Sequence, residues 1–83
     1  MILIRIKAEC VTRGRIPSER IALVMTDDGV GEQILVDESQ TDGTYVYLPE
    51  VWVEPDRVLV ELPQESASGC WRLWVPRNRT DLP

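Results

Sequence analysis

Histidine and phenylalanine are absent from this chain of 83 residues, and cysteine occurs only at Cys10 and Cys70. Without histidine there can be no serine-histidine-aspartate triad, no cysteine-histidine pair and no imidazole ligand for a metal ion. The two cysteines lie far apart and form no CxxC motif, so a tetrahedral zinc site lacks ligands. We therefore expect no catalytic site, no metal and no cofactor, and a protein that is not an enzyme.

The two cysteines themselves allow two interpretations. The first and last strands of a closed sheet often meet, so a disulfide between Cys10 and Cys70 is conceivable. The alternative is that both are small, buried, apolar side chains. We favour this alternative because thiols of cytosolic proteins usually stay reduced.

Long apolar runs are also missing. The longest stretch without a charged residue is residues 43–49, seven residues, whereas a helix needs about twenty to cross a bilayer. The apolar start of the chain is interrupted by Arg5 and Lys7, so it does not have the pattern of a signal peptide. We expect a cytoplasmic protein with no membrane segment.

Turn-forming residues recur at short intervals and separate short runs rich in valine, isoleucine and threonine. This arrangement is typical of all-β domains. We predict an antiparallel barrel or sandwich of about six strands, which resembles SH3-like and OB barrels in size only. Residues 1–78 would form the single domain, and residues 79–83 a short C-terminal tail.

The strands of the first half are predicted from alternation and turns. Residues 2–12 alternate as one long strand, with a possible bend, that buries Ile2, Ile4, Ile6, Ala8 and Cys10. Residues 20–27 and 32–37 suit a hairpin with Asp27 opposite Glu32, which turns Val24 and Leu35 outward. A short helix capped by Ser18 is the alternative for the first of these runs.

The second half gives the clearest pair of strands. Residues 44–48 form a strand that ends at Pro49, and residues 51–53 form a bend or a short edge strand. Residues 57–62 and 70–75 match as a hairpin, with the inward pairs Leu62–Trp71, Val60–Leu73 and Val58–Val75. The outward pairs are Leu59–Trp74 and Glu61–Arg72, and a slip of one residue would destroy every match.

The outward side chains suggest a function. Trp74, Arg72 and Leu59 would share an outer face, together with Val24 and Leu35 if both hairpins join one sheet. Exposed apolar patches often mark contact surfaces, and tryptophan and arginine are frequent at interface centres. We predict a protein-protein interaction or self-association module, so the partner is another protein or a second copy of the chain.

Nucleic acid is the alternative partner. The first twenty residues carry a net charge of +3, although the whole chain carries −5. Tyrosines and tryptophans could supply stacking surfaces for bases. Binding is disfavoured because a protein of this net charge repels a polyanion. The basic residues that would contact phosphates are Arg5, Lys7, Arg13, Arg15 and Arg20.

Overall fold

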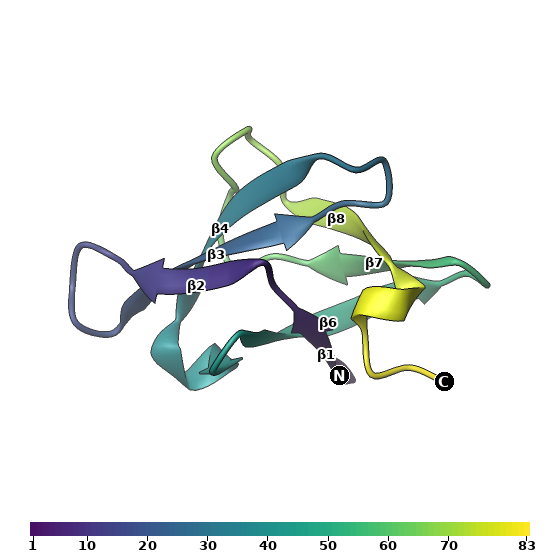
Figure 1. Cartoon of the computed structure of the whole chain (residues 1–83), viewed down its shortest axis with the longest axis horizontal. Helices are drawn as coiled ribbons and strands as arrows, with labels where there is room; N and C mark the ends of the chain where they lie inside the picture. The colour runs from purple at the N-terminus through teal and green to yellow at the C-terminus, as the bar shows by residue number, and fades with distance from the viewer.

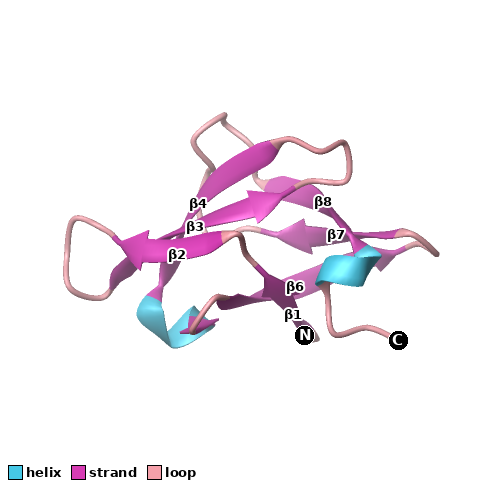
Figure 2. Ribbon diagram, viewed as in Figure 1, coloured by secondary structure: helices cyan, strands magenta, loops and turns pink.

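The computed structural model describes all 83 residues, which form two antiparallel sheets (Figures 1 and 2). The larger sheet has the order β1-β6-β7-β8, with the short β5 also paired to β6, and the smaller has the order β2-β3-β4. The sheets do not close into a barrel, and there are eight strands rather than about six. The all-β, antiparallel prediction is confirmed. The strands are β1 (Leu3–Lys7), β2 (Cys10–Arg13), β3 (Glu19–Met25), β4 (Gly31–Asp37), β5 (Thr41–Asp42), β6 (Tyr45–Val53), β7 (Arg57–Glu61) and β8 (Arg72–Pro76).

The hydrophobic core is built from alternate residues of the strands. Successive side chains of a strand point to opposite faces, so each strand contributes every second residue to the core. The only helical elements are two three-residue 3₁₀ turns, η1 (Glu38–Gln40) and η2 (Arg77–Arg79). The buried apolar side chains are Ile4, Ile6, Ala8, Ala22, Val24, Ile34, Val36, Val46, Leu48, Val58, Val60, Leu62, Leu73 and Val75.

The first apolar run is not one strand but two, and they belong to different sheets. The chain crosses between the sheets at Ala8 and Glu9. The amide of Ala8 donates to the carbonyl of Thr44 (2.8 Å), and the next amide, of Glu9, donates to that of Leu23 (2.8 Å). After this crossing the alternation restarts, so Cys10 faces solvent instead of the core.

The β3–β4 hairpin has a different register from the predicted one. Its loop closes between Thr26 and Val30, whose backbone amide and carbonyl bond at 2.9 Å, and Gly29 takes a positive φ of 83°. Three-residue loops of this kind commonly end in a left-handed residue. Val24 therefore lies opposite Glu32 instead of Leu35. Because the shift is an odd number of residues, Val24 points into the core, and its prediction as an outer-face residue was wrong.

Strand β6 continues through Pro49, which had been predicted to end it. Pro49 lies opposite Leu3 of β1, and the following amide, of Glu50, donates to the carbonyl of Ile2 (2.8 Å). Because amides alternate in direction along a strand, the nitrogen of Pro49 points away from β1. Pairing with β7 starts only at Glu50, so the missing donor of the proline breaks no ladder bond.

The β7–β8 hairpin has the predicted register. Val60 lies opposite Leu73, and Leu59 lies opposite Trp74. The prediction that Trp71 is buried was wrong, since 55% of its surface is exposed. Trp71 precedes β8 at a bend, and this end of the core is closed by a polar loop instead of an aromatic ring.

That polar loop, residues 63–70, is held by one buried carboxylate. Glu32 of β4 accepts hydrogen bonds from the Ser66 hydroxyl (2.7 Å) and the Ser68 amide (3.2 Å), and also from the Ser68 hydroxyl. Only 9% of the surface of Glu32 is exposed. Hydrogen bonds from the Ser68 and Ser66 side chains outweigh desolvation and lower the pKa of Glu32. Glu32 is therefore charged at neutral pH and anchors the loop.

The ends of the chain and the cysteines complete the fold. The C-terminal residues lie along β1, where Thr80 bridges to Ile6. Both cysteines are free thiols, so no disulfide forms, and only Cys70 packs against the core. Neither helical turn has the length or the apolar character needed to span a membrane.

The observed β3–β4 register makes a direct prediction about Val24 and Leu35. We expect Val24→Asp to destabilise the fold by at least about 3 kcal/mol, because it places an unpaired charge in the core opposite Glu32. Leu35→Asp should cost roughly 1 kcal/mol or less, because Leu35 is only partly buried on the outer face. Urea unfolding of both variants measures the difference, and equal losses would contradict the register.

The Glu32 anchor predicts a pH dependence. Its pKa in the folded state lies below the ordinary value of 4.5, so its stabilising effect is present above that pH and is lost as the pH falls through the folded-state pKa. We expect Glu32→Gln to lower the Tm at pH 7 and to flatten the decline of Tm between about pH 5 and pH 3. The matched control is Glu65→Gln, an exposed carboxylate of the same loop. If both variants give the same pH profile, the anchor makes no contribution.

Candidate protein-binding face

The most exposed aromatic side chain of the larger sheet owes its direction to a β-bulge. Leu48 is buried, and simple alternation would also turn Trp52 inward. The register between β6 and β7 shifts between Glu50 and Trp52, so that one residue of β6 is left without a partner. Trp52 consequently lies opposite the outward-facing Leu59, and 61% of its surface is exposed.

This bulge completes a row of large apolar side chains across three strands. Trp52 of β6 lies opposite Leu59 of β7, which in turn lies opposite Trp74 of β8. Cross-strand neighbours on one face are close enough for their side chains to pack. We call the outer surface of the larger sheet around this row, with Arg57, the Trp face.

Arg57 fixes the position of Trp74. Its guanidinium carbon lies 3.8 Å from the centroid of the indole ring. The same guanidinium bonds to carboxylate oxygens of Glu54 (2.8 Å) and Asp27 (3.1 Å). Hydrogen bonding to Glu54, and then to Asp27, raises the pKa of Arg57, so it stays charged over the ring. The β3–β4 turn contributes Asp27, whose amide also donates to the carbonyl of Trp74 (3.0 Å).

Further side chains of mixed character surround the row. Leu3, 54% exposed, lies opposite Pro49, and Arg5 lies opposite Tyr47. Arg5 also stacks over Tyr45, with its guanidinium carbon 4.4 Å from the ring centroid. At the other side of the face Arg72 pairs with Glu61 at 2.7 Å. The Trp face is therefore apolar along its centre and polar at its margins.

The structure brings together three of the five residues predicted for a protein-binding site. Leu59 and Trp74 are direct neighbours, and Arg72, two residues before Trp74, lies on the same face of β8. Val24 is buried, and Leu35 lies on the outer face of the smaller sheet. The two hairpins join different sheets, so the idea that they share one outer face was wrong.

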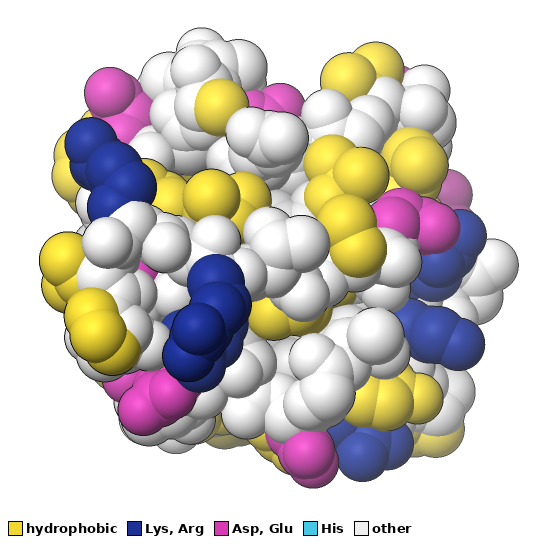
Figure 3. Space-filling model, turned by 60° about the vertical axis from the view of Figure 1, so that its left-hand side comes forward, with side chains coloured by type: hydrophobic (Ala, Val, Ile, Leu, Met, Phe, Trp, Pro, Cys, Tyr) yellow, Lys and Arg dark blue, Asp and Glu magenta, His cyan; other side chains and the backbone are white.

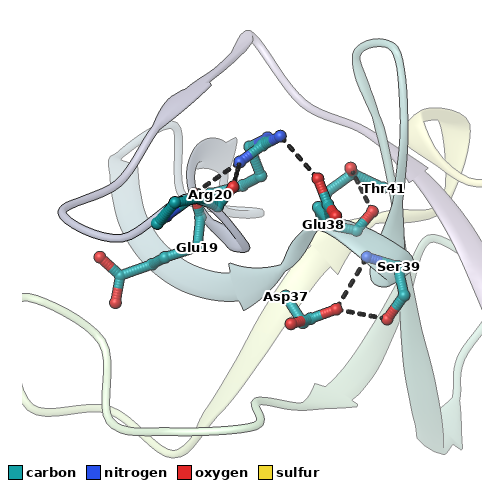
Figure 4. Close-up of polar contacts among 7 residues, drawn as sticks. Glu19, Arg20, Asp37, Glu38, Ser39 and Thr41 are labelled. Atoms are coloured by element: carbon teal, nitrogen blue, oxygen red, sulfur yellow. Dashed lines mark hydrogen bonds and ion pairs between the residues drawn. The ribbon is translucent and has the colours of Figure 1, made fainter.

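The five basic residues of the nucleic-acid alternative do not form one patch. Arg5 and Lys7 lie on β1, whereas the others lie on or beside the β2–β3 hairpin of the smaller sheet. Figure 4 shows Arg20 turned toward Glu38, with which it forms an ion pair at 2.8 Å. Its other terminal nitrogen donates to the carbonyls of Pro17 (2.6 Å) and Glu19 (2.9 Å). Arg20 thus has a structural role at the start of β3.

Figure 4 also shows what holds Glu38 in place. Asp37 caps the turn η1 by accepting hydrogen bonds from the amide (2.9 Å) and the hydroxyl (2.6 Å) of Ser39. These bonds, with a smaller effect of Arg20, lower the pKa of Asp37. The hydroxyl of Thr41 donates to the carbonyl of Glu38 (2.8 Å) and closes the turn.

Sequence reasoning missed Trp52, Arg57 and the two tyrosines as members of the Trp face. Residues 51–53, between two prolines, gave a signal for Trp52, because these strand-forming residues indicate that the strand continues after Pro49. Alternation counted from Leu48 turns Trp52 inward, and only an extra residue in β6 reverses this. The pairing of Arg57 with Asp27 depends on contact between segments far apart in the sequence.

No group of three or more cysteine, aspartate or glutamate side chains is placed to hold a metal ion. Comparison of the chain with protein-family models, with curated proteins and with solved structures yields no match.

Proposed function

We propose that the protein is a non-enzymatic module that binds another protein through the Trp face. The observation that carries this proposal is the row of Trp52, Leu59 and Trp74, which crosses three strands on the outer face, with Trp52 61% exposed and the other two half-buried. Tryptophan is enriched at the energetic centres of interfaces. The guanidinium of Arg57 holds Trp74 in one orientation before binding, so less side-chain conformational entropy is lost when a partner docks.

The charges of the Trp face define the chemistry of the partner. Arg57 and Arg72 are already paired with carboxylates, so the centre of the face is close to neutral. Arg5 and Lys7 form no ion pair and lie at the β1 margin. The complementary surface is therefore apolar at its centre and acidic at one margin.

The decisive comparison is between two tryptophans of similar exposure. We expect Trp52→Ser to remove binding of the natural partner, with affinity lowered at least about tenfold, because it deletes the most exposed side chain of the row. Trp71→Ser should leave binding unchanged, since Trp71 is 55% exposed but lies before β8, outside the row. Both variants should keep their stability within about 1 kcal/mol of the wild type.

The measurement is a quantitative pull-down from a lysate of the source organism, followed by titration of the purified partner. The supporting result is a protein lost with Trp52→Ser and retained with Trp71→Ser. Equal capture by the two variants would place binding elsewhere. Light scattering is done in parallel, and a dimer that dissociates on Trp52→Ser would show that the partner is a second copy.

Single-stranded nucleic acid is the second candidate, because Arg5 and Lys7 share a face with Tyr45 and Tyr47. A positive groove with stacked rings is the usual arrangement for such binding. The chain carries a net charge of −5, which repels a polyanion, so we expect no retardation of a labelled single-stranded oligonucleotide even at about 20 mM salt, where phosphate contacts are strongest. Retardation that is abolished by the double variant of Arg5→Glu and Lys7→Glu would assign the face to nucleic acid.

A further inference from the structure

The outer edge of the smaller sheet at β2 has no backbone partner. The smaller sheet ends at β2, which pairs with β3 alone, and Figure 1 shows it at the margin of its sheet. Unpaired edges offer hydrogen-bonding groups to another strand. Other edge strands are partly covered, by bonds from Asp81 to Arg5 on β1, from Asp27 to Trp74 on β8 and from Ala67 to Gln33 on β4.

The free groups on β2 can be identified from the ladder. The amide of Gly14 donates to the carbonyl of Glu19 (2.8 Å), so the even-numbered residues of β2 direct their backbone groups toward β3. The backbone groups of Val11 and Arg13 therefore point away from the sheet. No hydrogen bond is made to them from any other segment of the chain. A strand placed here would find two amides and two carbonyls in the correct spacing.

The side chains along this edge select what kind of strand fits. Val11 packs against the core, and Arg13, two residues later, is on the same face of β2 but lies exposed. Neither Arg13 nor Arg15 forms an ion pair. A hollow of about 200 Å³ adjoins the end of the strand. Its lining residues are Arg13, Gly14, Arg15, Ile16 and Pro17.

The surroundings of the edge hold one carboxylate, of Glu19, which accepts a hydrogen bond from the Arg15 amide (2.8 Å), beside the two unpaired arginines. Figure 3 turns the end of the molecule with the β2–β3 loop forward, and there Lys and Arg side chains stand among separate apolar patches and a few Asp or Glu side chains. The chain as a whole carries −5, so unpaired arginines beside an open strand edge are a local departure from its average charge. Local positive charge raises the encounter rate with an acidic segment.

We propose that the β2 edge binds an extended acidic segment of another protein, which adds to the smaller sheet as a fourth strand. An apolar residue of this segment lies beside Val11, and an acidic residue two positions away lies beside Arg13. The backbone groups of Val11 and Arg13 complete the new ladder, as in other cases of strand addition. This interface is separate from the Trp face and does not depend on the function proposed for it.

A second copy of the chain is the less favourable occupant. Pairing β2 with β2 of another copy would bring the Arg13 and Arg15 side chains of both copies to one seam. Charged side chains at a sheet edge are a common defence against such self-pairing. An acidic segment turns the same charges into an attraction.

The test uses the full chain and a defined probe. The probe is an acetylated and amidated peptide of eight residues, with threonine at every odd position and glutamate and valine alternating at the even positions. Binding is followed by changes in the amide chemical shifts of the protein in two-dimensional NMR spectra. We expect shifts centred on Val11, Thr12 and Arg13 and none at Trp52 or Trp74. Arg13→Glu should weaken binding at least about tenfold, whereas Arg13→Lys should change it by less than about threefold.

Two further variants test the backbone edge and the location of the site. Arg13→Pro removes an outward amide without removing a bond to β3, so it should abolish binding while the Tm confirms that the chain folds. Trp52→Ser should bind the peptide as the wild type does. The proposal is overturned if the peptide does not bind, or if a peptide with lysine in place of each glutamate binds equally well. It is overturned likewise if the chemical-shift changes fall on the Trp face, or if the Arg13→Pro variant still binds the peptide. It is also overturned if the wild type forms a dimer that Arg13→Pro dissociates.

Discussion

The burial of one side of every long strand between two sheets is the constraint on which the rest of the structure depends. Once Ile4, Leu48 and Val60 are fixed inside, their neighbours in the chain are fixed outside. The pattern of buried residues in this small domain thus determines which side chains lie on its surface. Local interruptions of the alternation, at Ala8 and at the β6 bulge, decide which side chains are redirected.

This constraint explains which parts of the fold could be predicted from the sequence. The β7–β8 hairpin was predicted correctly because each facing pair had matching chemistry, so only one register satisfied both faces. The β3–β4 hairpin offered no such contrast, since both of its faces are apolar near Leu23 and Val24. Its register was set instead by the loop from Thr26 to Val30, whose hydrogen bonds are not visible in an apolar pattern.

The candidate site was predicted in part for the same reason. Leu59, Arg72 and Trp74 came from the well-determined hairpin, whereas Trp52 depends on one unpaired residue in β6 that alternation cannot anticipate. Arg57 stacks on Trp74 under the control of Asp27, which reaches it from the other sheet. Contacts of this kind arise only after the sheets have packed, and no short-range pattern encodes them.

The crossing at Ala8 and Glu9 has a mechanical consequence. Two adjacent amides are committed to opposite layers, one to Thr44 and the other to Leu23. Neither layer can slide or lift without straining the single peptide unit that joins these amides. Local unfolding of one sheet therefore strains the other through this segment. We expect the two sheets to unfold as one cooperative unit instead of in succession.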